Sequence, residues 1–307
     1  MLNALTVDVE EWFHVCGIER SVPRERWDEL ESRVELSVQR VLDLCDRHSA
    51  KATFFFLGWV AQRHPDLVRL VRDAGHEIAS HGMWHRKVFQ MTSAEFEADV
   101  RSARDLMTEI TGVSPAAYRA PEWSIDLERR AWAYPILAKL GFTVDSSVSP
   151  LSWISGARLE TDPFLWSDPA APPPLKGARG HALRVFPVTT MRLFWENLPF
   201  TGGMGFRTSP YWYTAYFFEQ LGKRGVPGML YVHPWEFDDA HPRLPLGRFM
   251  RFLHGFNRPA VARNAGGLLR HFQFGTLSDA LDAVVERPRA QLELPPPAAE
   301  RAAEAVA

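Results

Sequence analysis

Cysteine is scarce in this sequence, with only Cys16 and Cys45 among 307 residues. The two are not in a CxxC arrangement and are too few for a disulfide framework, so we expect reduced, buried thiols. No apolar run approaches the ~20 residues that a membrane-spanning helix needs. The N-terminus, MLNALTVDVEEWF, has neither the basic start nor the long apolar run of a signal peptide. These absences predict a cytoplasmic protein without a membrane span.

Dense runs of basic residues are absent as well. Lysine and arginine number 35 against 37 aspartates and glutamates, which gives a formal net charge of −2. Nothing electrostatic therefore indicates nucleic acid or an anionic membrane as a partner. A hydrophobic content of 46% with 23% charged residues is typical of a globular protein with a buried core. The oligomeric state leaves no sign in the sequence.

Short apolar or β-branched runs alternate along the chain with longer helical patterns. This alternation predicts parallel strands wrapped by helices, and about seven strands suit a distorted (β/α)7 barrel of the α/β class. An open doubly wound sheet is the alternative, but no GxGxxG follows the first strand. Helices are expected at 32–48, 65–75, 92–112 and 127–141, and strands at 4–9, 51–58, 76–81, 116–120, 141–147, 183–189 and 228–235, with a weaker candidate at 272–277.

Two segments break this alternation. Residues 149–182 are rich in proline, glycine and alanine and are expected to form a long surface insertion. Residues 197–210 form a glycine-rich stretch between aromatic residues, expected to be a loop that shapes one wall of the site. We predict one domain over 1–285, with an extension from about 241, and a disordered Pro/Ala-rich tail at 286–307.

The stretch SHGMWH places His81 and His85 four positions apart. On one face of a helical turn, both rings could reach the same cation. Asp8 and Glu10 lie two apart on the first strand, so their side chains share a face. One carboxylate could complete the metal set while the other stays free as a base. A water on the open positions of such a metal has its pKa lowered toward ~7 and becomes a nucleophile.

Ionisable residues follow five of the expected strands, in TVDVEEWFH, SHGMWH, YRAPEW, VDSS and YVHPWE. Chemistry in a barrel gathers at these carboxyl ends. Arg119 suits the task of orienting Asp8 and keeping it charged. His233 could protonate a leaving nitrogen, and Asp145 is the candidate that orients it.

These motifs, in this order, resemble those of polysaccharide deacetylases with the NodB-type domain, a group similar to carbohydrate esterase family 4. The resemblance is strongest to the subgroup linked to exopolysaccharide and exosortase (PEP-CTERM) loci, which carries an extra C-terminal region. It covers about residues 3–240 by motif. It implies a distorted barrel, a divalent metal (Zn²⁺ first, with Co²⁺, Ni²⁺ or Fe²⁺ as alternatives), and hydrolysis of N-acetyl groups from hexosamines of a polysaccharide.

The resemblance also assigns roles to residues. Asp8 would be the base steadied by Arg119, His233 the acid, and His81 and His85 metal ligands. The usual first motif has two adjacent aspartates, the second of which binds the metal; here Val9 follows Asp8, so the ligand role passes to Glu10, with Glu11 as the weaker substitute. The substrate pocket is expected to include the following residues: Pro121, Glu122, Trp123 and Trp235.

Three other functions compete with this one. A small-molecule amidohydrolase of the same superfamily, acting on cyclic imides or ureides, would share the metal set but enclose it in a closed pocket rather than an open groove. A non-haem iron oxygenase also uses two histidines and a carboxylate, yet it gives Asp8 no task as a free base. A glycan-binding protein with a decayed site is the third alternative, favoured by the Val9 departure and the 11 tryptophans.

Overall fold

The computed structural model describes residues 1–14, 18, 21–126, 129–151, 162–167, 182–193, 196–242 and 246–284. Strand β1 (Leu2–Val9) lies at the centre of the fold and is buried along almost its whole length. Its carboxyl half, Thr6–Val9, pairs in parallel with β2 (Thr53–Phe56), and its middle, Ala4–Val7, pairs in parallel with β10 (Met229–Val232). A strand covered on both faces reads as a continuous apolar run, which is why these segments could be found in the sequence.

The sheet follows the order β10-β1-β2-β3-β4-β5-β7-β6, with β11 alongside β1. Seven of these strands, β10 to β7, run parallel, whereas β6 pairs antiparallel with β7. Among the described strands β10 does not close onto β6, so the sheet is a curled, open barrel, and the predicted distorted (β/α)7 fold is confirmed. The bounds of the other strands are Glu77–Ser80 (β3), Ala117–Tyr118 (β4), Val144–Asp145 (β5), Phe164–Ser167 (β6), Ala182–Val185 (β7) and Gln273–Gly275 (β11).

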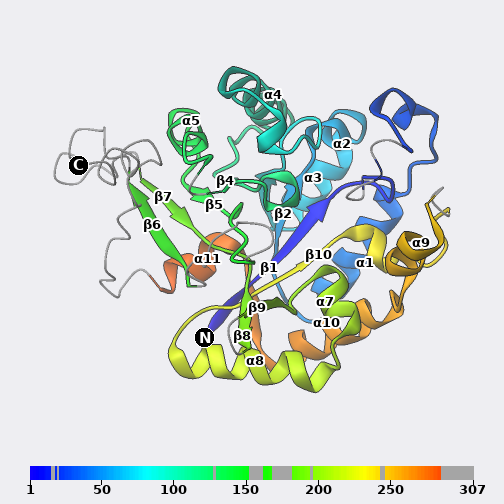
Figure 1. Ribbon diagram of the computed structural model, residues 1–307, viewed down its shortest axis with the longest axis vertical. Helices are drawn as coiled ribbons and strands as arrows, with labels where there is room; N and C mark the ends of the chain where they lie inside the picture. The colour runs from blue at the N-terminus through cyan, green and yellow to red at the C-terminus, as the bar shows by residue number, and fades with distance from the viewer. Residues whose placement is uncertain are drawn as a thin grey trace, which may run out of the picture.

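Helices cover the sheet on its outer side. In Figure 1, α2 to α5 run along the upper rim and α8 and α10 along the lower one. Helix α4 (Ser93–Thr111) shows how local sequence sets the bounds: Thr92 and Glu95 form a capping box, and Gly112 ends the helix at φ 76°. The other α-helices are Val34–Arg47 (α1), Gly58–Arg63 (α2), Pro65–Asp73 (α3), Ala133–Lys139 (α5), Gly203–Thr208 (α7), Tyr211–Arg224 (α8), Arg248–Gly255 (α9), Pro259–His271 (α10) and Leu277–Asp282 (α11).

Four 3₁₀ turns complete the described elements. They are Arg24–Glu29 (η1), Val88–Gln90 (η2), Pro121–Trp123 (η3) and Pro234–Phe237 (η4). Two of these turns, η3 and η4, directly follow strands β4 and β10 at the carboxyl edge of the sheet. They therefore position side chains at the mouth of the barrel.

The region after residue 241 is built into the barrel. Strand β11 pairs in parallel with Leu2–Ala4 of β1, and α10 packs against η4, α7 and α8. Residues of α10 and α11 such as Leu268 and Leu281 are buried in the core clusters. The predicted extension therefore contributes to the same sheet and core as the motif-bearing part.

Two expectations about loops are wrong in part. Residues 164–167 of the expected insertion form β6, and the expected glycine-rich loop at 197–210 begins with the end of a hairpin, β8 (Thr190–Leu193) with β9 (Glu196–Pro199), and contains helix α7. Strands that pair only at an edge lack the continuous apolar pattern of a central strand. The rest of the insertion, the tail and Cys16 lie outside the described residues.

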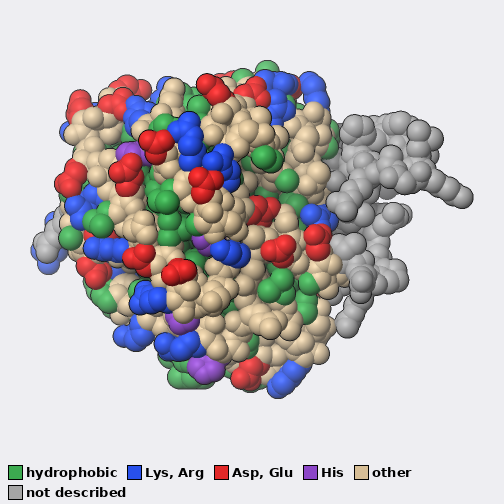
Figure 2. Space-filling model, turned by 180° about the vertical axis from the view of Figure 1, so that it is seen from behind, with side chains coloured by type: hydrophobic (Ala, Val, Ile, Leu, Met, Phe, Trp, Pro, Cys, Tyr) green, Lys and Arg blue, Asp and Glu red, His purple; other side chains and the backbone are tan. Residues whose placement is uncertain are grey.

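The surface charge, the burial of Cys45 and the character of the helices agree with the expectations from the sequence. Acidic and basic side chains are interspersed over the face drawn in Figure 2, without a large patch of one sign. Cys45 is buried, and burial raises the pKa of its thiol to about 12, as expected for an unreactive core cysteine. Within the described part of the chain, none of the helices combines the length and the apolar character needed to cross a bilayer.

Candidate metal centre and active site

The carboxyl ends of β1, β3, β4 and β10 surround a cavity of about 290 Å³. Asp8 and Glu10 enter it from β1, His81 and His85 from the segment after β3, and His233 from the end of β10. Parallel strands bring their carboxyl ends to one edge, so residues more than 200 positions apart in the chain meet there. The structure thus brings together most of the side chains that sequence motifs singled out.

Glu10, His81 and His85 form a group that could hold a metal ion. Each offers one ligand atom, and these atoms lie within 4.8 Å of one another. Nε2 of His85 is 2.8 Å from Oε2 of Glu10. Glu11 points elsewhere, because its carboxylate accepts hydrogen bonds from the Ser32 hydroxyl and the Arg33 backbone N–H. Of the two glutamates, Glu10 is therefore the one beside the histidines.

The histidine pair does not lie on a helical turn, contrary to the expectation from its spacing. After β3 the chain turns through Gly82 at φ 74°, and His85 itself adopts a left-handed φ of 51°. A Cβ at position 82 would approach Asp99 Oδ2 to 2.9 Å, so glycine is needed there on two counts. Strained backbone at a ligand position is held by its surroundings and is common in functional sites.

The chemistry of this donor set fits a divalent cation. Nδ1 of His81 lies 2.8 Å from the backbone carbonyl of Arg119, which as acceptor fixes the tautomer and leaves Nε2 free for a metal. Burial lowers the pKa of His81 to about 4, although Asp8 acts in the opposite direction, so the ring is neutral and able to ligate. Oε2 of Glu10 is buried and, apart from the facing His85 nitrogen, has no donor. Two imidazoles and a carboxylate are ligands that Zn²⁺ prefers.

Asp8 is paired with Arg119 rather than with the histidines. Nη1 of Arg119 lies 2.6 Å from Oδ1 of Asp8, and both side chains are almost fully buried. Nη2 of Arg119 donates to the hydroxyls of Thr6 and Ser146, both at 3.0 Å. Burial is the largest effect on the pKa of Asp8 and acts to raise it, but the charges of Arg119, His81 and His233 together with the Arg119 hydrogen bond outweigh it, and the pKa is lowered. Asp8 therefore stays ionised beside the metal group.

His233 is oriented by Glu236, which the motif YVHPWE contains but which sequence reasoning did not single out. Nδ1 of His233 lies 3.3 Å from Oε2 of Glu236, and its backbone N–H donates to the same oxygen. Glu236 in turn lies 3.4 Å from Nε of Arg207 on α7. Burial acts to lower the pKa of His233, but Glu236 and then Glu10 raise it to about 9.

Asp145 does not make the predicted contact with His233. It is fully buried and accepts hydrogen bonds from Tyr134 and from the hydroxyl and backbone N–H of Ser147. Burial raises its pKa to about 6. The position at the end of β5 led to the prediction, but β5 lies two strands beyond β3, whereas Glu236 lies three residues from His233. Glu236, which is close to His233 along the chain, is therefore the partner of the ring.

The expected substrate residues lie at the rim of the cavity with one exception. Glu122 and Trp123 line it from η3, where both adopt left-handed φ values of 54° and 48°. Trp235 lines it from η4 and stacks on His233 with ring centroids 5.5 Å apart. Pro121, the first residue of η3, is buried and is not among the lining residues. The glycine-rich stretch does supply a wall, as predicted, through Gly203 and Met204 of α7.

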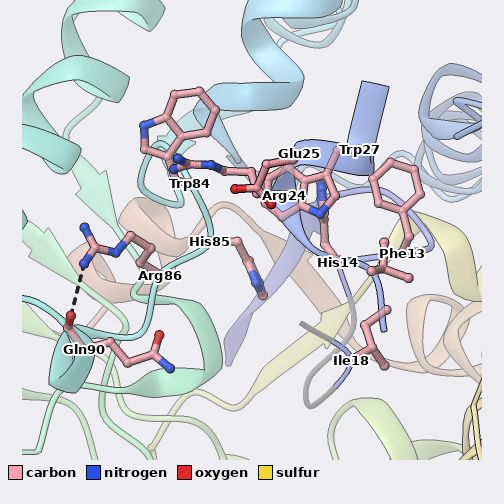
Figure 3. Close-up of a pocket in the computed structure, with 11 residues that line it drawn as sticks. Phe13, His14, Ile18, Arg24, Glu25, Trp27, Trp84, His85, Arg86 and Gln90 are labelled. Atoms are coloured by element: carbon pink, nitrogen blue, oxygen red, sulfur yellow. Dashed lines mark hydrogen bonds between the residues drawn. The ribbon is translucent and has the colours of Figure 1, made fainter. Parts of the chain in front are cut away.

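A second hollow of about 370 Å³ adjoins the metal group across His85. Figure 3 shows His85 reaching into it, with Trp84 and Arg24 on one side and Trp27 and His14 on the other. The Arg24 guanidinium lies over the Trp84 ring, 4.6 Å from its centroid. Of this hollow, sequence reasoning identified His85 alone, because its other walls come from the segments after β1 and after β3, where no regular pattern indicates which side chains face inward.

Comparison with known proteins identifies the class. The fold and site define an α/β barrel with a candidate metal centre at its strand ends. Residues 27–144 match the family model of polysaccharide deacetylase. Residues 146–282 match a domain of unknown function, DUF3473. A peptidoglycan deacetylase of Helicobacter pylori is 30% identical over 37% of this chain and 38% of its own length. A chitooligosaccharide deacetylase of Rhizobium leguminosarum bv. trifolii is 28% identical over 42% and 53%. Residues 27–144 of this chain are thus similar to polysaccharide deacetylases.

A solved structure supports the fold over the whole chain. A Mycobacterium smegmatis protein provisionally assigned as a polysaccharide deacetylase is 18% identical, covers 95% of this chain and 93% of its own, and superposes with a TM-score of 0.62. The sequence matches, by contrast, span about a third to a half of the length of the curated relatives. The fold similarity therefore extends over more of the chain than the matches to these curated relatives do.

Proposed function

We propose that this protein is a metal-dependent hydrolase that removes N-acetyl groups from hexosamine residues of a polysaccharide, an exopolysaccharide being the substrate that the motifs favour. One observation supports this above all: a two-histidine, one-carboxylate group stands beside a buried, charged aspartate that is not part of it. In this arrangement Glu10 could bind a metal while Asp8 remains available for proton transfer. The match of residues 27–144 to the polysaccharide deacetylase family model supports this reaction class.

Glu10, His81 and His85 would hold the metal, with Zn²⁺ the first choice. When bound, a divalent cation there supplies a Lewis acid that polarises the amide carbonyl and lowers the pKa of water. The backbone carbonyl of Arg119 aims His81 at the ion, and the curl of the chain through Gly82 brings His85 to the same point.

Asp8 serves as the general base. Its carboxylate lines the cavity beside the metal group, and its pKa is held low by Arg119, so it accepts a proton from the attacking water. Oδ1 is engaged by Nη1 of Arg119 at 2.6 Å, and no hydrogen bond to Oδ2 from the described residues competes for that proton. The guanidinium both fixes the direction of the carboxylate and offsets its burial.

His233 donates a proton to the departing nitrogen. It lies on the far side of Glu10 from His85, with Nε2 3.5 Å from Oε1 of Glu10 and Nδ1 held by Glu236. An imidazole anchored at Nδ1 presents Nε2 to the cavity, which is the geometry a general acid needs. Trp235 stacks on the ring and limits its rotation.

The shape of the site favours a glycan over a small cyclic amide. The central cavity shares His85 with the hollow of Figure 3 on one side, and shares Leu246 and His254 with a third hollow on the other. Hollows that adjoin the candidate metal centre on both sides favour a substrate of several sugar units. A ureide or imide hydrolase would need a closed pocket instead.

Metal analysis combined with acetate release tests this proposal. The purified protein should bind about one divalent ion per chain and release acetate from N-acetylglucosamine oligomers, with activity lost in chelator and restored by Zn²⁺. His81→Ala and His85→Ala should lose both metal and activity while remaining folded. Metal binding without acetate release from any N-acetylated glycan, together with hydrolysis of a cyclic imide, would establish the rival amidohydrolase. Glycan binding without metal or turnover would establish the decayed site.

A further inference from the structure

A cleft rich in arginine lies beyond the wall of the central cavity. It has a volume of about 630 Å³ and is formed by α9 and the segments on either side of that helix. In Figure 1, α9 lies on the side of the molecule toward which the carboxyl ends of β1 and β10 point. The described lining residues include three arginines and no carboxylate: His241, Leu246, Arg248, Arg251, Phe252, His254, Gly255 and Arg258.

The arginines of this cleft are available to an anion. Arg248 and Arg251 lie three apart on α9, hence on one side of the helix, and both are exposed. Among the described residues neither guanidinium has an acidic partner. Arg258 is half-buried and is fixed by His241 and by the backbone carbonyls of Asp238 and Asp239. Bidentate guanidinium groups are the usual recognition elements for carboxylates.

The cleft adjoins the central cavity that holds the candidate metal centre. Leu246 and His254 line both hollows. Trp235 stacks on His254 at 4.5 Å and on His233 at 5.5 Å, so a wall of flat rings leads from the proposed acid to the arginines. A glycan with its N-acetylated unit at the metal would place a neighbouring unit in the cleft.

We propose that this arginine cleft binds the carboxylate of a uronic acid next to the N-acetylated hexosamine, so that the substrate is an acidic polysaccharide. The proposal rests on the proposed function, since it places a second sugar subsite beside the same metal centre. It specifies the substrate class that the metal centre alone leaves open. Arg248 and Arg251 have no acidic partner among the described residues, and the protein as a whole is slightly acidic, with a net charge of −2.

Two tetrasaccharides distinguish this proposal from simple deacetylase activity. One alternates N-acetylglucosamine with glucuronic acid, and the other contains N-acetylglucosamine alone. We expect the wild type to have the higher kcat/KM on the acidic one, with the difference shrinking as salt rises. Arg248→Ala with Arg251→Ala should lower kcat/KM on the acidic substrate about tenfold more than on the neutral one, mainly through KM.

The matched control carries the same loss of charge elsewhere. Arg263 and Arg270 are exposed on α10 and do not line the cleft, so Arg263→Ala with Arg270→Ala should leave the preference unchanged. Equal losses on both substrates, or a wild type without preference for the acidic one, would overturn the proposal.

Calorimetry separates failure of the cleft from failure of the proposed function. If the wild type released no acetate from either tetrasaccharide, the proposed function would fail, but the cleft could still be tested by binding of the acidic one. Binding by the wild type and the control pair, lost in the Arg248/Arg251 variant, would support the cleft alone. Absence of binding to the wild type would overturn it.

Discussion

Arg119 holds two parts of the site at once: its backbone carbonyl lies 2.8 Å from Nδ1 of His81, and its guanidinium lies 2.6 Å from Oδ1 of Asp8. A proposed metal ligand and the proposed base are therefore positioned by one residue, through different atoms. The side chain also lies over the Phe55 ring, 4.1 Å from its centroid, and is wholly buried. Because backbone and side chain act separately, substitutions can separate the two tasks.

Substitution of Arg119 should lower the stability of the fold but leave metal binding largely intact. Arg119→Ala leaves the carboxylate of Asp8 buried without its partner, which typically destabilises by about 3–5 kcal/mol. The backbone carbonyl that aims His81 remains, so a variant that folds should still bind metal. Urea unfolding and metal content per chain measure the two effects. Adding Asp8→Asn should recover part of the lost stability, because it removes the unpaired charge; a double variant less stable than Arg119→Ala would contradict this account.

The two carboxylates of β1 should separate by role. Asp8→Asn removes the proposed base but no ligand, so metal should stay bound while kcat falls by about 10²–10⁴-fold. Glu10→Ala removes a ligand and should lose the metal first. Glu11→Gln is the control, since Glu11 faces Ser32 and the backbone of Arg33, and its metal content should match the wild type. Metal retained by Glu10→Ala and lost by Asp8→Asn would reverse the assignment.

The fold could be predicted because its central strands are buried on both faces. The runs around β1, β2 and β10 are continuous and apolar, and the helix between Thr92 and Gly112 is marked by residues that cap both ends. Strand β6 was not predicted, because it pairs antiparallel on one side only and lies in a segment whose composition is that of a loop. The apolar content of a segment reflects how deeply the segment is buried, and an edge strand is not buried enough to have a continuous apolar sequence.

The site could be predicted where residues follow strands directly. Asp8, His81, Arg119 and His233 all lie within two residues of a strand end, so the topology alone brings them together. The partner of His233 could not be predicted this way, because choosing Asp145 or Glu236 depends on which carboxylate the η4 turn points back at the ring. The conformation of His85 escaped for a similar reason, since a left-handed backbone has no signature in a non-glycine residue.

Gly202 should be essential for the wall that Tyr231 forms. A Cβ at this position would lie 2.3 Å from the Tyr231 ring, which packs against Trp123 at the cavity. Gly202→Ala should therefore cost about 1–3 kcal/mol through overpacking and push the ring toward the site, lowering activity. Gly222 on α8 is the matched control, since a Cβ there meets nothing within 4 Å, and Gly222→Ala should be neutral or stabilising. Thermal unfolding and acetate release measure both; equal behaviour would contradict this prediction.

His76 should make the fold sensitive to mild acid. Its Nδ1 accepts the Ala52 backbone N–H at 3.1 Å, and burial, then Lys51, lowers its pKa to about 4. The unfolded chain takes up the proton near pH 6.5, so this contribution to stability is complete above that pH and is lost as pH falls from 6.5 through 4. His76→Asn keeps an acceptor but does not titrate. Its unfolding free energy in urea should fall less steeply over that range; parallel pH curves would show that His76 takes no part.

Proton delivery by His233 should depend on the leaving group. His233→Ala should lower kcat on an N-acetyl substrate by about 10²–10⁴-fold, the usual share of a general acid, with little change in binding, because the proton is needed only as the C–N bond breaks. An activated acetyl ester needs little protonation of its leaving group, so most of its rate should survive. Glu236→Gln keeps an oxygen that can accept from His233 but removes the charge facing Nδ1, and should give a smaller loss with the same dependence on leaving group. Acetate release from both substrates measures this, with metal content as the control. If His233→Ala lost amide and ester activity equally, His233 would be a structural residue that supports Glu10, to which its Nε2 lies 3.5 Å away.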